Sequence, residues 1–265
     1  MSISTPKRIS GRDNPEFKRF LAVRARKDRE RILVEGPKLL EEAIRSGLRI
    51  EVVACGDQGV PEGLAASAPV PRIVQFSAPL MKSLSEVETH QGVIALVERP
   101  RLRDDWLKAK DAFVLVLDGL QNPGNVGTLF RTAEAAGVSG ALLTRGCADP
   151  LSPKALRASA GSAFRLPHLL DLSTPELLER LPGGFSLVAA VAGPGALSVF
   201  EGALLSLPLA LALGSEGSGL DPGIEGASSH RVRIPMARNV ESLNVAAAGA
   251  IVMFEIARRA GILRI

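Results

Sequence analysis

Three segments of the sequence combine turn-forming residues with isolated polar side chains that could do chemistry. The first, NPGNVGTLFRTAEAAG, contains Asn125 and a single arginine, Arg131. The second, LALGSEGSGL, places Glu216 among glycines that let the backbone approach a ligand, and its carboxylate would suit a cation better than a phosphate. The third, IPMARNVESLNVAAAGAIVMFE, contains Ser242 and Asn244 ahead of a long uncharged stretch. Each of these side chains fits either a structural or a catalytic role.

The structural alternatives are specific. Arg131 could form a surface ion pair with Glu134, three residues later on the same helix. The glycines around Glu216 could form an ordinary turn, and Asn244 could simply satisfy nearby backbone groups. Ser242 could cap the last helix through its hydroxyl.

Other kinds of active site find no support in the sequence. It contains neither GxGxxG after a strand nor GxxxxGK[ST], which argues against nucleotide folds of those types. The histidines His90, His168 and His230 stand apart from one another, and Cys55 and Cys147 have no metal-type spacing. We therefore expect no metal and no disulfide framework.

The elements that must position the three segments follow from Asp111 onward. The apolar runs FVLVL, ALLT, SLVAAV, PLALAL and RVRI have strand length and mostly lack polar alternation, which is typical of a parallel sheet buried on both faces. Helical patterns lie between and after them, at residues 126–137, 152–161, 174–181 and 242–259. Such α/β sheets bind ligands at the carboxyl ends of their strands, which is where all three segments fall.

The first hundred residues predict a smaller α/β domain. A helix at 14–27 has Asn14 as a candidate cap and Pro15 at its first position. Strands are expected at 31–35, 50–55, 72–76 and 92–98, with helices at 37–47 and 77–87. The charged segment RPRLRDDWLKAKD reads as a linker. The expected organisation is a domain at 1–100, a linker at 101–110 and a larger domain at 111–265.

Charge is concentrated at the start of the chain. The net charge is +4, but residues 1–31 hold ten Lys/Arg against four Asp/Glu, so the remaining chain is slightly acidic. A basic front end indicates contact with a polyanion such as RNA, although a solvated basic helix is the alternative. The predicted RNA-binding residues are Lys7, Arg8, Arg12, Arg24, Arg26, Lys27, Arg29 and Arg31.

Composition excludes other classes of protein. No stretch approaches the roughly 18 uncharged apolar residues of a membrane span, and MSISTPKRISGRDNP lacks the apolar core of a secretion signal. A cytoplasmic protein without membrane contact is expected.

With all three segments in view, the chain resembles the SpoU (TrmH-type) family of SPOUT RNA 2′-O-ribose methyltransferases. The match covers the three quoted segments, in the family's order, over about 150 residues. RILVEGPKLLEEAIRSG also resembles the substrate-binding domain in front of many members, which is similar to small RNA-binding ribosomal proteins. The resemblance implies a C-terminal parallel-sheet SPOUT domain with a deep trefoil knot, S-adenosylmethionine as cofactor, and a homodimer formed through the C-terminal domain.

The resemblance also assigns roles to residues. Asn125, Arg131, Glu216, Ser242 and Asn244 match the family's catalytic positions. The cofactor-binding positions are Gly214, Glu216, Ile234, Met236, Ser242 and Leu243. A guanidinium holds its proton beyond pH 12, so Arg131 is either a perturbed proton acceptor or a cation that positions an RNA phosphate.

The implied function is methylation of a ribose 2′-hydroxyl, most simply in large-subunit ribosomal RNA, because the family's tRNA enzymes usually carry short terminal extensions instead of a separate front domain. A tRNA methyltransferase, an antibiotic-resistance methyltransferase of the same ribosomal RNA, and a non-catalytic RNA-binding or ribosome-assembly protein on the same scaffold are the alternatives.

Overall fold

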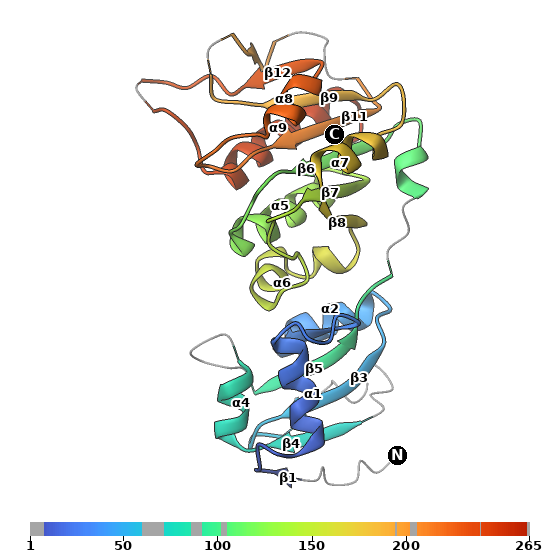
Figure 1. The fold of residues 1–265 in the computed structure, drawn as a ribbon, viewed down its shortest axis with the longest axis vertical. Helices are drawn as coiled ribbons and strands as arrows, with labels where there is room; N and C mark the ends of the chain where they lie inside the picture. Colours follow the sequence, from blue (N-terminus) through green and yellow to red (C-terminus); the bar gives the residue numbers. More distant parts are fainter. Residues whose placement is uncertain are drawn as a thin grey trace. The chain divides into compact units, whose positions relative to one another are not determined.

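The computed structural model describes residues 8–59, 72–85, 92–101, 105–193, 195–201, 206–238 and 240–263. These residues form two compact units (Figure 1). The first unit contains the described residues up to Arg101 together with Leu151–Phe164, and the second contains the remainder. The sequence predicts a single boundary at residues 101–110, so the return of Leu151–Phe164 to the first unit differs from that expectation. Within the described residues, no helix is long and apolar enough to cross a bilayer.

The first unit is built on a mixed five-stranded sheet in the order β1-β4-β3-β5-β2. Its elements are β1 (Arg8–Ile9), α1 (Pro15–Arg24), β2 (Arg31–Glu35), α2 (Pro37–Arg45), β3 (Ile50–Cys55), β4 (Ile73–Phe76), α4 (Ala78–Leu84), β5 (Val93–Glu98) and, from the later segment, α6 (Pro153–Ser159) and the 3₁₀ helix η2 (Ser162–Phe164). β5 pairs antiparallel with β2 and β3, whereas β4 pairs parallel with β1 and β3.

The start of α1 confirms the sequence prediction. Asn14 caps the helix by accepting a hydrogen bond from the Glu16 N–H at 2.9 Å, and Pro15 occupies the first helical position. Two buried phenylalanines of α1, Phe17 and Phe20, pack edge-on against Phe76 of β4, with ring centroids 5.5 and 5.3 Å apart. These aromatic contacts fix α1 on the sheet.

The segment Leu151–Phe164 joins the first unit through a shielded ion pair and a close contact. Arg157 of α6 lies 3.2 Å from the carboxylate of Glu35, which is only 7% exposed at the end of β2. A β-carbon on Gly161 would lie 2.9 Å from Glu42. Glu35 and Glu42 are both far from this segment in the sequence, so the local sequence does not indicate that Leu151–Phe164 packs on the first unit.

The second unit contains a seven-stranded sheet in the order β10-β12-β9-β11-β6-β7-β8. Its elements are η1 (Asp105–Lys108), β6 (Phe113–Leu117), α5 (Pro123–Ala135), β7 (Gly140–Thr144), β8 (His168–Leu172), α7 (Thr174–Arg180), β9 (Ser186–Ala190), β10 (Leu197–Ser198), β11 (Leu209–Leu213), α8 (Pro222–Ala227), β12 (His230–Arg233) and α9 (Val245–Arg259). Every neighbouring pair runs parallel, as predicted. The sequence prediction missed β8, β10 and α8.

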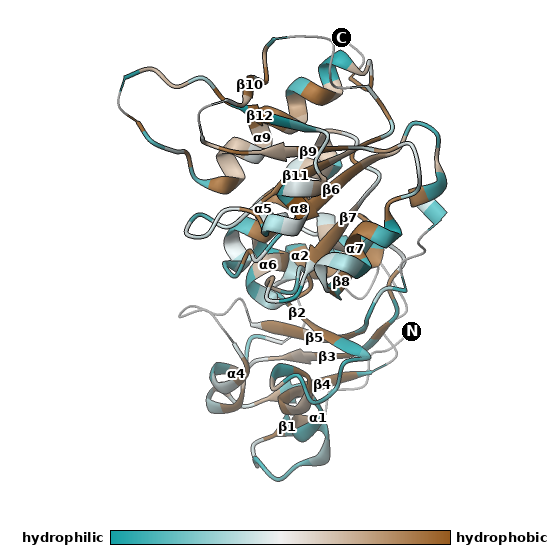
Figure 2. Cartoon of the chain, turned by 45° about the horizontal axis from the view of Figure 1, so that its top comes forward, coloured by the Kyte–Doolittle hydropathy of each residue, from teal (hydrophilic) through white to brown (hydrophobic). Residues whose placement is uncertain are grey.

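Helices cover both faces of this sheet. Leu177 of α7 and Ile224 of α8 join the apolar cluster on one face. On the other face α5 packs beside α9, and a β-carbon on Gly249 of α9 would lie 2.5 Å from Leu129 of α5 and 2.8 Å from Leu213 of β11. Figure 2 shows the central strands β6, β7 and β11 in the brown of hydrophobic residues, and all three are buried throughout. Burial on both faces explains their unbroken apolar runs.

The predicted linker is wrong in its central part. Asp105–Lys108 forms η1, Leu107 is 6% exposed, and the only tryptophan, Trp106, packs against the core of the second unit. A β-carbon on Gly140 at the start of β7 would lie 2.5 Å from the indole ring. Because the neighbours of Trp106 are charged, this segment shows no hydrophobic periodicity, and the contact of Trp106 with the core could not be predicted from the sequence pattern.

Candidate active site

The carboxyl ends of four parallel strands meet at one edge of the second unit. Strand pairing sets Leu117 of β6 beside Leu213 of β11 and Leu143 of β7, and sets Leu213 beside Ala190 of β9. The loops that follow β6 and β11 therefore start side by side, as predicted from the sequence.

Glu216 is the point where the three quoted segments converge. Its Oε1 accepts hydrogen bonds from Asn125 Nδ2 at 3.0 Å, from Asn244 Nδ2 at 2.8 Å and from the Val245 N–H at 3.4 Å. Asn244 Nδ2 also donates to Asn125 Oδ1 at 3.2 Å. We call Asn125, Glu216 and Asn244 the Glu216 cluster. Among the described residues, Glu216 Oε2 has no hydrogen-bond partner, so one carboxylate oxygen is available to a ligand.

The loop that presents Glu216 is closed on itself. Ser215 and Gly219 exchange two backbone hydrogen bonds of 3.0 Å, and the hydroxyls of Ser215 and Ser218 lie 2.7 Å apart. A β-carbon on Gly214 would lie 2.2 Å from the Gly219 carbonyl carbon, a backbone atom that cannot swing away. Glycine is therefore required at position 214 to bring the two ends of the loop together.

Local sequence explains how the two asparagines are held. Asn122 caps α5 by accepting from the Gly124 N–H, and Pro123 follows at the first helical position, which leaves Asn125 in the first turn. The predicted cap of the last helix is wrong. α9 begins at Val245, and its cap is Asn244, not Ser242. The side-chain oxygen of Asn244 accepts hydrogen bonds from the Ala246 and Ala247 N–H groups at 3.0 and 3.4 Å.

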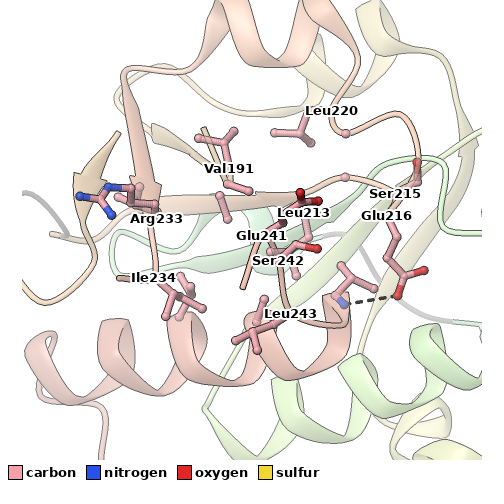
Figure 3. A pocket seen from close by; sticks show the side chains of 18 of the residues that line it. Val191, Leu213, Ser215, Glu216, Leu220, Arg233, Ile234, Glu241, Ser242 and Leu243 are labelled. Carbon is pink, nitrogen blue, oxygen red and sulfur yellow. Dashed lines mark hydrogen bonds between the residues drawn. The ribbon is translucent and has the colours of Figure 1, made fainter. Parts of the chain in front are cut away.

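A cavity of about 490 Å³ lies beside the Glu216 cluster. Its wall includes all six predicted cofactor positions: Gly214, Glu216, Ile234, Met236, Ser242 and Leu243. Figure 3 shows Glu216 and Arg233 at opposite ends of the cavity. Arg231, also in the wall, forms an ion pair of 2.8 Å with Glu225. The cavity thus has Glu216 at one end and Arg233 at the other, and the wall between them combines apolar side chains with the polar Glu241 and Ser242.

Arg131 lies on the solvent side of α5, and among the described residues no hydrogen bond joins it to the Glu216 cluster. It is exposed, it does not line the cavity, and within the described part of the chain it forms no hydrogen bond or ion pair. The ion pair with Glu134 considered from the sequence does not form, because Glu134 is bound by Arg165 through contacts of 2.6 and 2.9 Å. The guanidinium of Arg131 is therefore open to a ligand.

A buried acid that the sequence analysis missed holds the strand ends together. Asp118 directly follows β6 and is 9% exposed. Its Oδ1 accepts from the Thr144 hydroxyl at 2.7 Å, and its Oδ2 accepts from the Asp221 N–H at 2.6 Å. Asp221 in turn caps α8, just after the loop that carries Glu216. The sequence signals were present, since an acid ends the FVLVL run and Asp221 precedes a proline, but both were read as loop.

The basic front end is only partly available to RNA. Lys7 lies outside the described residues. Arg8, Arg12, Arg24, Arg26, Lys27 and Arg29 are exposed. Among these exposed residues, Arg8 pairs with Asp57 at 3.2 Å. Because α1 ends at Arg24, the predicted RNA-binding residues from Arg26 onward lie after the helix and not on its surface.

Arg31, the last residue of the predicted RNA-binding set, is bound by two acids. It pairs with Glu51 at 2.9 Å and with Asp28 at 2.8 Å, and its side chain is 32% exposed. The hydrogen bonds that Arg31 donates, to Glu51 first and to Asp28 second, raise the pKa of Arg31. Burial acts to raise the pKa of Glu51, but the hydrogen bonds and positive charge of Arg31 and Arg19 outweigh it, so that this pKa is lowered. Arg31 therefore contributes to the structure of the first unit.

Comparison with known proteins gives matches over both parts of the chain. Residues 112–254 match the SpoU rRNA Methylase family, and residues 14–95 match an MRM3-like substrate binding domain. An uncharacterized tRNA/rRNA methyltransferase of Synechocystis is 34% identical over 95% of this chain and 93% of its own length. The 23S rRNA (guanosine(2553)-2′-O)-methyltransferase RlmP of Bacillus subtilis is 29% identical over 94% and 99%. The crystal structure of an AdoMet-bound rRNA methyltransferase from Sinorhizobium meliloti superposes with a TM-score of 0.81 at 27% identity, covering 97% of this chain and 99% of that one.

Proposed function

This chain belongs to the SpoU rRNA methylase family, and from that membership we propose that it is an S-adenosylmethionine-dependent methyltransferase of ribose 2′-hydroxyls in large-subunit ribosomal RNA. The Bacillus subtilis relative carries this activity in its name, and the Sinorhizobium meliloti structure contains the methyl donor. The observation that carries the proposal is the convergence of Asn125 and Asn244 on Glu216 at the rim of one cavity. A scaffold used only for RNA binding has no need of this arrangement.

The cavity fits S-adenosylmethionine in size and in charge. Its volume of about 490 Å³ is within the range of roughly 300–1,000 Å³ for small-molecule sites. Glu216 offers a carboxylate oxygen of the right charge for a sulfonium cation. We propose that Gly214, Ile234, Met236 and Leu243 hold the cofactor, with Ser242 beside them. When bound, the cofactor supplies an electrophilic methyl group.

The chain's own residues then orient the ribose. A ribose hydroxyl is a weak acid, so its attack requires that its proton be accepted or shared. We propose that Asn125 and Asn244, fixed by Glu216, align the sugar, because a small error in approach geometry is costly to the rate. A guanidinium holds its proton beyond pH 12, so we propose that Arg131 holds an RNA phosphate next to the reacting ribose, while the hydroxyl proton passes through water to the solvent as the methyl group is transferred.

The last helix supports a homodimer. α9 exposes Ala247, Ile251 and Phe254 at helical spacing, and the two larger side chains are 36% and 42% exposed. No charged residue precedes Glu255 in α9, so this apolar stripe suits a second copy of the same helix. We propose that two chains associate through α9 and that the C-terminal segment is threaded into the family's trefoil knot. Phe254→Glu should convert dimer to monomer by light scattering; an unchanged mass would contradict the proposed interface.

The first unit is proposed to bind RNA by its phosphates. The exposed Arg12, Arg24, Arg26, Lys27 and Arg29 supply charge, and the chain has few aromatic residues on which bases could stack. Binding of that kind weakens steeply with salt.

An enzyme of ribosomal RNA would work in the cytoplasm, which is where we propose that this one acts.

The test is transfer of labelled methyl groups to RNA. The protein is incubated with labelled S-adenosylmethionine and in vitro transcripts of large-subunit ribosomal RNA or of tRNA. We expect label in the ribosomal transcript; label in tRNA alone would select the tRNA alternative, and no label in either would select the non-catalytic one. Arg131→Ala should retain cofactor binding by calorimetry while losing transfer, and Arg131→Lys, which keeps a point charge, should lose less.

A further inference from the structure

Thr128 lies between the two side chains of α5 that we assign to the RNA substrate. Asn125 and Arg131 are six positions apart on this helix. Of the five residues between them, Thr128 alone is exposed. The other four are buried in the second unit: Val126, Gly127, Leu129 and Phe130. RNA that reaches from Asn125 to Arg131 along α5 therefore passes over Thr128.

The geometry of a helix places Thr128 midway between these two residues. Three residues rise about 4.5 Å along an α-helix and turn about 60° short of a full circle. Asn125, Thr128 and Arg131 follow one another at this spacing, so they form a shallow spiral along one side of α5. Side chains of a helix lean toward its N-terminus, so the guanidinium of Arg131 reaches back over the turn that carries Thr128.

The hydroxyl of Thr128 is available to a ligand at this place. Inside a helix, a threonine hydroxyl often donates to the carbonyl four residues earlier. Thr132 does this, since its hydroxyl donates to the Thr128 carbonyl at 3.0 Å. The Thr128 hydroxyl itself has no hydrogen-bond partner in the parts of the chain that the structure describes. Two threonines of one helix thus differ, because only the hydroxyl of Thr132 is used by the helix.

We propose that the Thr128 hydroxyl donates a hydrogen bond to the RNA phosphate that Arg131 holds. This rests on the proposed function, in which Arg131 binds the phosphate next to the reacting ribose. Phosphate oxygens accept hydrogen bonds from threonine hydroxyls as well as from guanidinium groups, and a hydroxyl has one proton to donate. Arg131 supplies the charge, and Thr128 fixes the phosphate on the side nearer to Asn125.

A neutral contact of this kind strengthens RNA binding without taking part in the transfer. The contact is made before the reaction and is kept during it, so its loss raises the dissociation constant and KM for RNA and leaves kcat unchanged. A hydroxyl carries no charge, so its loss also leaves the salt dependence of RNA binding unchanged. Loss of Arg131, by contrast, reduces the slope of that dependence by about one.

The main experiment compares Thr128→Val with Thr132→Val. Valine removes the hydroxyl but keeps the branched shape and a similar helix propensity. Thr132 is the matched control, because its hydroxyl is used within the helix. The dissociation constant of a fluorescent large-subunit ribosomal RNA transcript is measured over a range of salt concentrations. Methyl transfer gives kcat and KM, and calorimetry gives the affinity for S-adenosylhomocysteine.

Thr128→Val should weaken RNA binding roughly three- to tenfold at every salt concentration, with unchanged kcat and unchanged cofactor affinity. Thr132→Val should match the wild type. Thr128→Ser, which keeps the hydroxyl, should stay near the wild type as well.

A double variant tests whether Thr128 and Arg131 hold the same phosphate. Once Arg131→Ala has released that phosphate, removal of the Thr128 hydroxyl should weaken RNA binding little further. The two losses in affinity should therefore not add.

Four results would overturn the proposal. Wild-type affinity in Thr128→Val would mean that the hydroxyl does not touch RNA. Equal losses in Thr128→Val and Thr132→Val would mean that the helix was altered and no contact was lost. A Thr128→Ser variant as weak as Thr128→Val would mean that the hydroxyl is not the binding group. Additive losses in the double variant would mean that Thr128 and Arg131 bind different parts of the RNA.

Misfolding and failure of the proposed function are both separable from failure of this inference. If the thermal midpoint of Thr128→Val is lowered, Thr128→Ala takes its place, because alanine favours a helix more than threonine does; it should show the same loss of RNA affinity. Wild-type methyl transfer and its loss in Arg131→Ala are measured in the same series and do not depend on Thr128. If the wild type transfers no methyl group to RNA, the proposed function fails; if only the loss in Thr128→Val is missing, the inference about Thr128 fails alone.

Discussion

Asn244 carries two functions that substitution can separate. Its Oδ1 caps α9 by accepting from backbone N–H groups at 3.0 and 3.4 Å. Its Nδ2 donates to Glu216 at 2.8 Å and to Asn125 at 3.2 Å, which holds the Glu216 cluster together. Alanine removes both functions, whereas glycine removes the amide but is itself well tolerated as a helix cap.

The expected magnitudes follow from those contacts. Loss of the cap in Asn244→Ala costs about 1 kcal/mol of folding free energy, while Asn244→Gly costs only a few tenths of a kcal/mol. A hydrogen bond to a charged carboxylate contributes about 1.5–3 kcal/mol, and the exposure of this site places it near the lower bound. About 1.4 kcal/mol corresponds to a factor of ten. Both variants should therefore lose roughly tenfold or more in kcat/KM, and Asn244→Ala should be the less stable of the two because it also lacks a good cap.

Two assays decide the outcome. Urea unfolding of each variant gives stability, and steady-state methyl transfer to a large-subunit ribosomal RNA transcript gives kcat/KM. If Asn244→Gly retains wild-type kcat/KM while Asn244→Ala loses it, activity follows stability, the amide acts only as a cap, and the reasoning about the Glu216 cluster is wrong.

Three further predictions concern other parts of the second unit. Gly214→Ala should abolish binding of S-adenosylhomocysteine by calorimetry, because its β-carbon would lie 2.2 Å from backbone across the loop; retained affinity would show that the loop is not fixed there. Asp118→Leu, which leaves two buried donors without an acceptor, should raise KM for the cofactor far more than Asp118→Asn, which keeps one acceptor and the shape. Hydrogen bonds from Arg258 first and then Arg259 lower the pKa of Glu255 from 4.5 to about 2, so this group stabilises the folded state above pH 4.5 and loses that contribution as pH falls toward 2. The stability gap between wild type and Glu255→Gln should therefore shrink between pH 5 and pH 3, and a constant gap would contradict the assignment.

The sequence predicted the central strands and the position of the site for a simple reason. Strands buried on both faces contain only apolar residues, so FVLVL and PLALAL could be recognised without partners. The start of α5 was missed by three residues: the helix was expected from residue 126 but begins at Pro123 behind the cap Asn122, and these two residues were taken for part of the loop. Because parallel strands end at a common edge, the convergence of the loops followed from the strands.

What the sequence could not predict depends on distant partners. Ser242 and Asn244 are both good caps, and the sequence alone does not show that the helix begins behind Asn244, whose Nδ2 is held by Glu216. Whether Glu134 pairs with Arg131 or with Arg165 is decided by the fold of a segment thirty-one positions later. The ion pair between Arg157 and Glu35 joins positions separated by 122 residues and has no counterpart in local pattern.

The central claim is that the methyl group goes to a ribose oxygen of ribosomal RNA. A 2′-O-methyl group removes the hydroxyl that alkali needs to cleave the neighbouring linkage, so alkaline digestion of RNA labelled by this protein distinguishes sugar from base. We predict that the label appears in alkali-resistant dinucleotides from the large-subunit transcript and that it is absent with Arg131→Ala. Label recovered in mononucleotides would place the methyl group on a base and contradict the account.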